Sequence, residues 1–270
     1  MKDRMLRKNQ KIKTVIFLGR KPGATKALEY LVENGLSITM AIAPAKEDYM
    51  PKLSTTAKKY RIPVYHDEGI IYKKIAKCDK RILNTDLVIS YLFWRKIKSP
   101  LINIAKLGCI NFHPAPLPDY KGRAGYNTAI LDARKKYGVS AHFIDSEELD
   151  NGPIIEVKKF AINSSKETAL SLEKKSQEKL LELFKTTIDA FMNGRKVKTH
   201  KNSGGLYLTA PELNELKEVN PQKDSLEDID KKIRAFFFPP YRGATITIKG
   251  RKFTLINDEV MKIVHNIFKK

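Results

Sequence analysis

The sequence predicts a doubly wound α/β fold, in which helices cover both faces of a mostly parallel sheet. From residue 14 onward, short apolar runs alternate with amphipathic helical stretches, which is typical of parallel strands joined by helices. A chain of 270 residues with 42% hydrophobic residues can bury such a core without disulfides or metals. Its two cysteines, Cys78 and Cys109, show no C-x-x-C spacing and are expected to be reduced thiols.

The expected elements follow one another in a regular order. Strands are predicted at residues 14–19, 37–43, 62–66, 86–92 and 109–113, with helices between them at 24–33, 55–60 and 100–106. A helix at 126–136, strands at 139–144 and 154–160, and a long amphipathic helix at 166–193 come next. Ser164 or Ser165 is the expected N-cap of the long helix, just before Glu167.

Beyond the long helix the composition changes. The stretch "GRKVKTHKNSGG" is polar and Gly-rich, as in a linker or a surface loop. A short helix at 226–236 precedes two alternating strands that meet at Lys249-Gly250, which predicts a β-hairpin. We therefore expect a basic arm at residues 1–12, a Rossmann-like main domain at 13–195, and a linker with a small C-terminal subdomain at 196–270.

The charge and the N-terminus bound the class of partner. A net charge of +21 favours an anionic partner such as nucleic acid, a nucleotide or a phosphate group. It also fits lysines on solvated helix faces, since they recur at helical intervals among glutamates. The apolar run after the basic N-terminus is too short for a membrane span, and no small-residue cleavage site follows. We expect a cytoplasmic protein that does not enter a membrane.

Candidate chemistry lies at strand ends, because ligands of open parallel sheets bind beyond the carboxyl ends of the strands. In "CINFHPAPLPDYKGR", Asn111 and His113 end a predicted strand, and their spacing of two puts both on one side. In "LDNGPII", Asp150 lies in a loop before the next strand. An amide, an imidazole and a carboxylate form a general acid–base set, and the prolines preorganise the loop after His113.

A purely structural interpretation stays open at this point. An N-x-H at a strand end is often hydrogen-bonded scaffolding, and "LDNG" is a good turn sequence. Other chemistries have weaker support, because "GRKPGA" matches neither a P-loop nor G-x-G-x-x-G, and no G-x-S-x-G is present. The remaining histidines, His142 among them, lack metal-ligand spacing, so no metal site is expected.

The pair "GCINFHPAPLPDYKG" and "LDNGPII" resembles the formyltransferases that use 10-formyltetrahydrofolate, over residues 13–195. The resemblance implies that Asn111, His113 and Asp150 are catalytic. The substrate amine would attack the formyl carbon, and Asn111 and His113 would stabilise the oxygen of the tetrahedral intermediate. Asp150 would hold His113 and help to shuttle the proton, and its charge is expected to keep His113 substantially protonated near neutral pH.

The same resemblance implies a site for the pterin of the cofactor, 10-formyltetrahydrofolate. It would lie between the strand end "SYLFWRKI" and the loop "DSEELD". Trp94 could instead belong to the core. The expected contacts come from Tyr91, Leu92, Phe93 and Trp94 on one side and from Asp145, Glu147 and Leu149 on the other.

Within the family, the segment "IRAFFFPPY" before a short hairpin is similar to the nucleotide-sugar N-formyltransferases. This implies a nucleotide-linked amino deoxysugar as acceptor, dTDP-linked in our expectation, a role in lipopolysaccharide O-antigen synthesis, and a homodimer. Phe236–Phe238 could instead only seal the subdomain. The expected acceptor contacts, through phosphate binding and base stacking, are Arg20, Lys21, Lys121, Arg234, Phe238 and Tyr241.

Two alternative functions stay open. Methionyl-tRNA formyltransferases carry a sizeable C-terminal barrel, for which the residues after the long helix are expected to be too few. A non-catalytic folate- or RNA-binding relative would suit the basic arm, where residues 1–13 hold six Lys or Arg against one Asp. A solvated tail is the favoured interpretation of the arm, and the intact set of three polar residues argues against lost activity. Nucleic acid is therefore not the expected partner.

Overall fold

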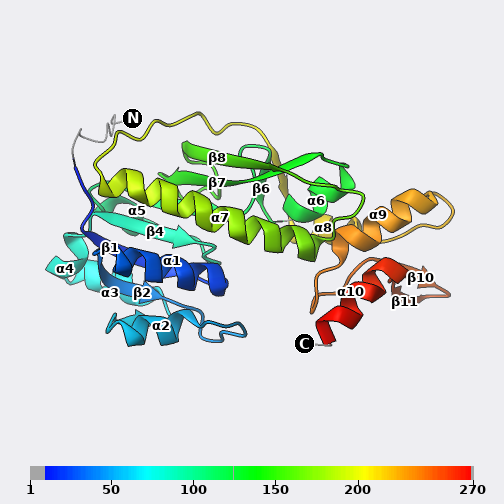
Figure 1. Cartoon of the computed structure of the whole chain (residues 1–270), viewed down its shortest axis with the longest axis horizontal. Helices are drawn as coiled ribbons and strands as arrows, with labels where there is room; N and C mark the ends of the chain where they lie inside the picture. Colours follow the sequence, from blue (N-terminus) through cyan, green and yellow to red (C-terminus); the bar gives the residue numbers. More distant parts are fainter. Residues whose placement is uncertain (1–9, 124, 269–270) are drawn as a thin grey trace.

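A seven-stranded sheet forms the centre of the molecule (Figure 1). The computed structural model describes residues 10–123 and 125–268. The strand order is β3-β2-β1-β4-β5-β7-β8, with β1 to β5 parallel and β7 and β8 antiparallel at one edge. This confirms the doubly wound, mostly parallel fold. The strands are β1 (Thr14–Gly19), β2 (Ser37–Ile42), β3 (Val64–Tyr65), β4 (Leu87–Tyr91), β5 (Cys109–His113), β7 (Lys136–Ile144) and β8 (Ile154–Ala161).

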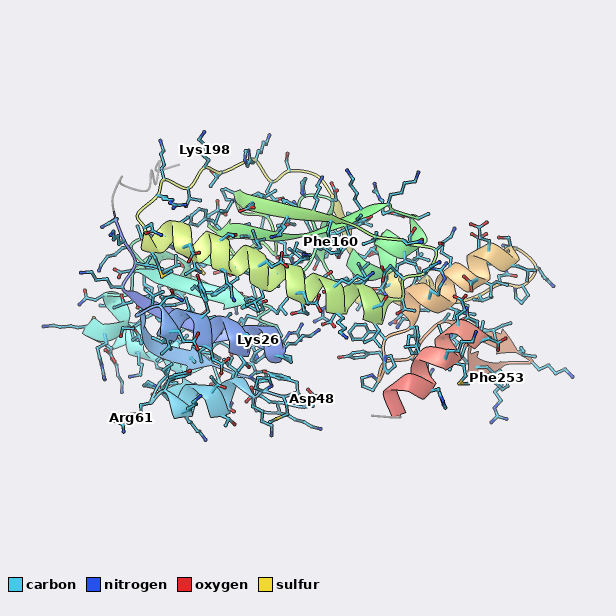
Figure 2. All side chains as sticks on the ribbon, viewed as in Figure 1. Lys26, Asp48, Arg61, Phe160, Lys198 and Phe253 are labelled. Atoms are coloured by element: carbon cyan, nitrogen blue, oxygen red, sulfur yellow. The ribbon has the colours of Figure 1, made fainter. Side chains whose placement is uncertain are left out.

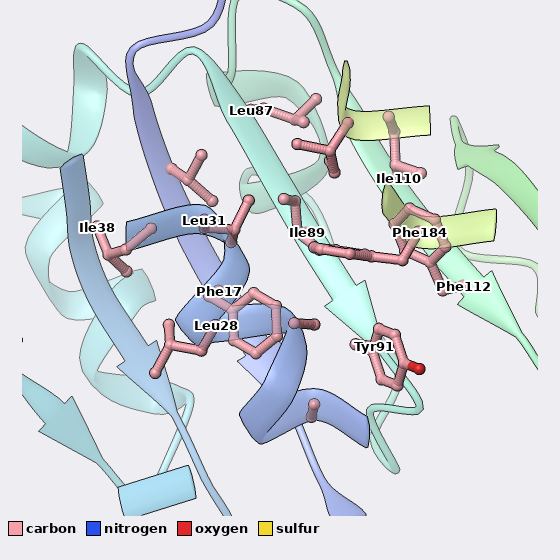
Figure 3. Packing of buried hydrophobic residues seen from close by; sticks show 14 of the residues in the cluster. Phe17, Leu28, Leu31, Ile38, Leu87, Ile89, Tyr91, Ile110, Phe112 and Phe184 are labelled. Carbon is pink, nitrogen blue, oxygen red and sulfur yellow. The ribbon is translucent and has the colours of Figure 1, made fainter. Parts of the chain in front are cut away.

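Helices cover both faces of the sheet. Successive residues of a strand point to opposite faces, and apolar side chains of the central strands need cover on both. Phe17 packs on the face covered by α1 and α7, whereas Ile16 packs on the face covered by α3, α4 and α5. Figure 3 shows the first face, where Phe184 of α7 lies against Phe112 and Tyr91. The helices are α1 (Lys21–Glu33), α2 (Leu53–Lys59), α3 (Gly69–Ala76), α4 (Lys80–Leu83), α5 (Leu101–Ile104), α6 (Gly125–Leu131) and α7 (Ala169–Met192).

Two helix ends differ from the expectation. The N-cap of α7 is Thr168, whose side chain accepts from the Ser171 N–H, and not Ser164 or Ser165. Glu167 therefore precedes the helix. It is buried, and its carboxylate accepts a hydrogen bond from the Ser171 hydroxyl in the first turn. The helix predicted at 126–136 ends at Leu131, because the chain from Lys136 onward pairs with β5 and β8 instead.

The C-terminal elements pack beyond the amino end of α7 (Figure 1). The helix α9 (Leu226–Phe236) and the hairpin of β10 (Thr245–Ile248) and β11 (Arg251–Thr254) confirm the prediction. Asn127 of α6 donates to the Ala235 carbonyl of α9 at 2.6 Å, which joins this unit to the sheet domain. The remaining elements are a parallel pair of β6 (Tyr120–Gly122) and β9 (Leu206–Leu208), with α8 (Ala210–Glu215) and α10 (Asp258–Phe268).

The positive charge lies largely on solvated faces. Lys26 on α1 and Lys198 after α7 are exposed and point away from the sheet (Figure 2). The basic arm at residues 1–12 lies mostly outside the described residues. Within the described part of the chain, no helix has the length and apolar character needed to cross a membrane.

Phe184 is expected to be a major contributor to the stability of this core. Phe184→Ala should lower the free energy of unfolding by about 3–5 kcal/mol, because a fully buried ring is replaced by a cavity. Met261→Ala is the control, since its side chain is 54% exposed and should change stability by less than about 0.5 kcal/mol. Urea unfolding measures both, and equal effects would contradict this packing.

Candidate active site

The Asp150 side chain contacts Asn111 and His113, the two polar residues at the end of β5. Its Oδ1 accepts a hydrogen bond from Asn111 Nδ2 at 3.2 Å, and its Oδ2 lies 3.4 Å from His113 Nδ1. The second oxygen also accepts from the backbone N–H of Gly122 at 2.9 Å. Asp150 lies in the loop between β7 and β8, and β7 is the direct neighbour of β5. The fold thus brings together the three residues that sequence reasoning selected.

Two residues that the sequence did not reveal complete the cluster. Ser90 Oγ donates to Asn111 Oδ1 at 2.7 Å, and Asn111 Nδ2 lies 3.0 Å from His142 Nε2. His142 Nδ1 lies 2.8 Å from the Phe143 carbonyl oxygen, so Nδ1 carries the proton and Nε2 accepts from the amide. Ser90 and His142 lie directly opposite Asn111 on β4 and β7. Strand register would have identified them, but register is not readable from spacing along the chain.

Burial governs the ionisation of His113. Its residue surface is only 5% exposed, and its Nε2 lies 3.1 Å from the Tyr120 carbonyl oxygen. Desolvation lowers the pKa of His113, although the charge of Asp150 opposes the shift. The expectation of a largely protonated His113 at neutral pH is therefore wrong, because burial outweighs the neighbouring carboxylate. With its proton on Nε2, the neutral ring presents a free Nδ1 toward Asp150.

Asp150 stays ionised in this buried position. Burial alone would raise the pKa of Asp150, but attraction to the protonated forms of His113 and His142 and the hydrogen bond from the Gly122 N–H outweigh burial. They hold the pKa well below its usual range. The site therefore contains a fixed negative charge beside a neutral imidazole at neutral pH.

Tight backbone contacts shape the loop that carries Asp150, which spans residues 145–153. Asp150 itself has a φ of 50°, in the left-handed region. A Cβ on Gly152 would lie 2.0 Å from the Phe143 carbonyl oxygen, so a side chain cannot be accommodated there. The Phe143 N–H donates to the Pro153 carbonyl at 2.9 Å and closes the loop on β7. The carboxylate is thus presented by a backbone with little freedom.

The proline loop, residues 114–119, is anchored to β7 as well. Ser140 Oγ accepts from the Leu117 N–H at 2.8 Å and donates to the Ala115 carbonyl at 2.7 Å. The Tyr137 hydroxyl donates to the Pro114 carbonyl at 3.1 Å. These bonds add to the fixed φ angles of the prolines and hold the start of β6 against the site.

Half of the expected pterin surface lies in the core. The Tyr91 side chain is fully buried and stacks on Phe112 with ring centroids 6.0 Å apart (Figure 3). Leu92 is buried in the same cluster, and its carbonyl oxygen accepts from Arg20 Nε at 2.7 Å. Tyr91 ends β4 and Leu92 follows it in the turn, and both side chains pack in the core between sheet and helices, so the expectation that they form a binding surface is wrong.

The other half remains accessible. Phe93 and Trp94 are half-buried, with ring centroids 4.6 Å apart. The Asp150 loop lies close to this segment, since the Ser99 N–H donates to Glu147 Oε1 at 3.2 Å. Two aromatic rings beside an exposed loop suit a flat, polar-edged ring system. The three residues expected on the loop side, Asp145, Glu147 and Leu149, are all exposed.

Four of the six expected acceptor residues gather beside the amino end of α1. Lys21 Nζ lies 5.6 Å from the centroid of the Phe238 ring and 2.5 Å from Glu173 Oε1. The ring centroids of Phe238 and Tyr241 are 5.9 Å apart, and Arg20 lies within electrostatic range of the Tyr241 side chain. Two cations beside two partly exposed rings could bind a phosphate and a base together.

Arg234 does not join this cluster. It is 4% exposed, its Nε lies 2.8 Å from Asp230 Oδ2, and its Nη1 donates to the Ser164 and Glu167 carbonyls. The expectation that Arg234 meets a pyrophosphate is wrong, because its guanidinium ties α9 to the segment before α7.

The other expected acceptor contacts, Lys121 and the phenylalanines of the segment 236–238, lie partly on the surface and partly in the core. Lys121 Nζ donates to Asn151 Oδ1 at 2.7 Å, beside the Asp150 loop rather than in the cluster of Lys21. Phe236 and Phe237 are buried and seal α9 against its neighbours, which leaves Phe238 as the available ring. Among the described residues, no group of three or more His, Cys, Asp or Glu side chains could hold a metal ion.

A buried amide, imidazole and carboxylate at the ends of strands define a site for group transfer. Residues 38–188 match the family model described as formyl transferase, which is more than half of the 270-residue chain. The chain therefore belongs to the formyl transferase family, and it is an enzyme that transfers a formyl group.

Individual relatives differ in the acceptor named for them. A methionyl-tRNA formyltransferase of Thermodesulfovibrio yellowstonii is 27% identical over 255 residues, covering 92% of this chain and 80% of that protein. An N-formyltransferase from Helicobacter canadensis, solved with folinic acid and dTDP-3-aminofucose, has a TM-score of 0.71 and 25% identity, covering 92% of this chain and 89% of that one. A 4-N formyltransferase from Francisella tularensis has a TM-score of 0.73 and 20% identity, covering 91% and 97%.

The pKa of His113 provides a direct test of this geometry. In NMR titrations of histidine-labelled protein, His113 should titrate below its ordinary value of about 6.5. Asp150→Asn should lower this pKa further, because it removes the negative charge that favours the imidazolium. His113→Gln assigns the resonance by its loss. A His113 pKa above 6.5, or a rise in Asp150→Asn, would contradict the account.

Proposed function

We propose that this enzyme moves the formyl group of 10-formyltetrahydrofolate to the amine of a nucleotide-linked amino sugar. The bond from the formyl carbon to the folate nitrogen breaks, and an amide bond to the sugar nitrogen forms. The amine loses one proton, and the folate nitrogen gains one. The observation that carries the proposal is the cluster of Lys21, Arg20, Phe238 and Tyr241 in the same molecule as the Asn111–His113–Asp150 site.

Asn111 would stabilise the charge that develops on the formyl oxygen. The donor supplies an electrophilic carbonyl carbon, whose oxygen becomes negative as the amine attacks. In the structure both hydrogens of Asn111 Nδ2 are directed to Asp150 and His142. The formyl oxygen would replace the longer bond to Asp150 at 3.2 Å, while Ser90 and His142 keep the amide oriented.

His113 and Asp150 would accept the proton from the attacking amine. The neutral imidazole has its free Nδ1 directed at Asp150 Oδ2, 3.4 Å away, so a proton arriving there is shared between them. The imidazolium formed in this way is stabilised by Asp150 and by the Tyr120 carbonyl oxygen. His113 would then act as a base first and return the proton to the departing folate nitrogen.

The donor would bind between the Phe93–Trp94 pair and the Asp150 loop. The rings provide the apolar surface, and the exposed backbone from residue 145 to 149 provides donors and acceptors for a pterin edge. The Helicobacter canadensis enzyme was solved with folinic acid, which supports a folate as the donor. Tyr91 and Leu92 contribute only by shaping the strand end.

The acceptor would bind at the Lys21 cluster. Lys21 and Arg20 would face the diphosphate, and the rings of Phe238 and Tyr241 would pack on the base. The complex of the Helicobacter canadensis enzyme with dTDP-3-aminofucose supports a dTDP-linked amino sugar. Synthesis of O-antigen and a homodimer stay predictions of the resemblance, and a cytoplasmic location stays a prediction from the composition and the N-terminal sequence.

A methionyl-tRNA acceptor is the second candidate. The Thermodesulfovibrio yellowstonii relative carries that name, and the net charge of +21 would suit an RNA. Against it, residues 245–254 form a two-stranded hairpin, and the described part of the C-terminal unit holds no other strand after β9. The described C-terminal unit is therefore not itself a barrel.

An assay with 10-formyltetrahydrofolate separates the two acceptors. We expect one nucleotide sugar, from a panel of dTDP-, UDP- and GDP-linked amino sugars, to gain one formyl group by mass. Asn111→Ala and His113→Ala should each lower kcat by at least about 100-fold, since each removes a group that acts only in the transition state. Formylation of methionyl-tRNA alone would overturn the sugar assignment.

Tyr241 tests the place of the acceptor site. Tyr241→Ala should raise the KM for the nucleotide sugar about 5- to 100-fold, the loss of one stacking contact, and leave the KM for the folate unchanged. The matched control is Phe253→Ala, which removes an exposed ring of the hairpin and should change neither constant. If Tyr241→Ala left the KM for the nucleotide sugar unchanged, the nucleobase would not bind on this ring.

A further inference from the structure

Asn202 lies in the polar, Gly-rich segment after α7, yet it is buried against the Asp150 loop. Its residue surface is 8% exposed. Its Nδ2 donates to the carbonyl oxygens of Asp150 and Gly152, both at 2.9 Å. One amide group therefore fixes the backbone on both sides of Asn151, directly behind the Asp150 carboxylate.

The chain around Asn202, residues 200–208, is called the strap below. At its start, His200 and Ile154 exchange both backbone hydrogen bonds, at 2.9 and 2.8 Å. At its end, the Leu206 N–H donates to the Asp119 carbonyl at 2.9 Å, and β9 pairs with β6. Figure 1 shows the segment after α7 running back along β8 to the region of β6. The strap thus contacts the Asp150 loop first and the proline loop second.

Close approach of the strap to the proline loop depends on Gly205. Its φ is 88°, and a Cβ there would lie 1.6 Å from the Pro118 carbonyl oxygen. The strand β6 that follows the proline loop carries Gly122, whose N–H donates to Asp150 Oδ2. The strap is therefore attached on both sides of the contact between Asp150 and β6.

We propose that Asn202 is a positioning residue for Asp150, acting through the backbone of the Asp150 loop. The proposal rests on the proposed function, which makes Asp150 part of the catalytic set. Asn202 Oδ1 has no hydrogen-bond partner within the described residues, so the two Nδ2 bonds to the loop are its whole polar contribution. A side chain without two N–H donors cannot make them.

The physical effect would be on geometry. Asp150 holds a left-handed φ of 50°, which a residue with a side chain keeps only when its surroundings impose it. Without the bonds from Asn202, the carboxylate would be free to move relative to His113 Nδ1. A displacement of about 1 Å at a reacting group lowers rates by about 100-fold.

The test compares Asn202→Leu, which keeps the size of the side chain but has no donor, with Asn202→Gln, which keeps the amide. Ser203→Ala, at the exposed next residue, is the control. We expect Asn202→Leu to lower kcat about 10- to 100-fold with both KM values within about twofold, Asn202→Gln to recover part of the loss, and Ser203→Ala to match the wild type. Circular dichroism confirms folding, and Asn202→Ala replaces the Leu variant if that one does not fold.

The pKa of His113 by NMR is the second readout, because a merely structural role would not move it. In Asn202→Leu it should fall in the same direction as in Asp150→Asn, since the carboxylate is less well held beside the ring. A folded Leu variant with unchanged kcat and unchanged His113 pKa would overturn the proposal. A lowered His113 pKa in Asn202→Leu would support the positioning role even if Asp150→Asn kept full activity. Full activity in Asp150→Asn would instead overturn the catalytic role of Asp150.

Discussion

The buried charge of Asp150 is the constraint on which the rest of the site depends. An ionised carboxylate away from water is stable only when donors and positive partners surround it. Here the Asn111 amide and the Gly122 N–H donate to the carboxylate, and the His113 ring lies beside it. These groups come from β5 and β6, so the carboxylate in the loop after β7 links the ends of both strands. The groups that compensate Asp150 are also those that the proposed chemistry uses.

Close backbone contacts and side-chain hydrogen bonds, rather than apolar packing, hold this charge in place. Gly152 and Gly205 stand where a Cβ would collide with a carbonyl oxygen, and Ser140 anchors the proline loop from β7. The two proposed substrate contacts lie on different segments, with the Phe93–Trp94 pair after β4 and the Phe238–Tyr241 pair after α9.

Local patterns predicted the fold well, and they predicted the three central residues. Apolar runs and helical spacing identified most elements of the sheet, and the strand-end position of Asn111 and His113 brought them to the Asp150 loop. Contacts across the sheet were not predictable, since Ser90 and His142 are found only through strand register. Side-chain direction at the turn after β4 and the buried bonds of Arg234 likewise depend on tertiary packing. Asn202 belongs to a segment whose composition suggests only a linker.

The central claim is that Asn111, His113 and Asp150 act as one unit around a shared charge. A double-mutant cycle on kcat tests it most directly, with Asn111→Ala, Asp150→Asn and the double variant assayed on the same nucleotide sugar. The account predicts strong non-additivity, so that the double variant is little slower than the slower single variant. If the activation free energies lost in Asn111→Ala and Asp150→Asn simply add in the double variant, the two residues act independently. That result would contradict the account.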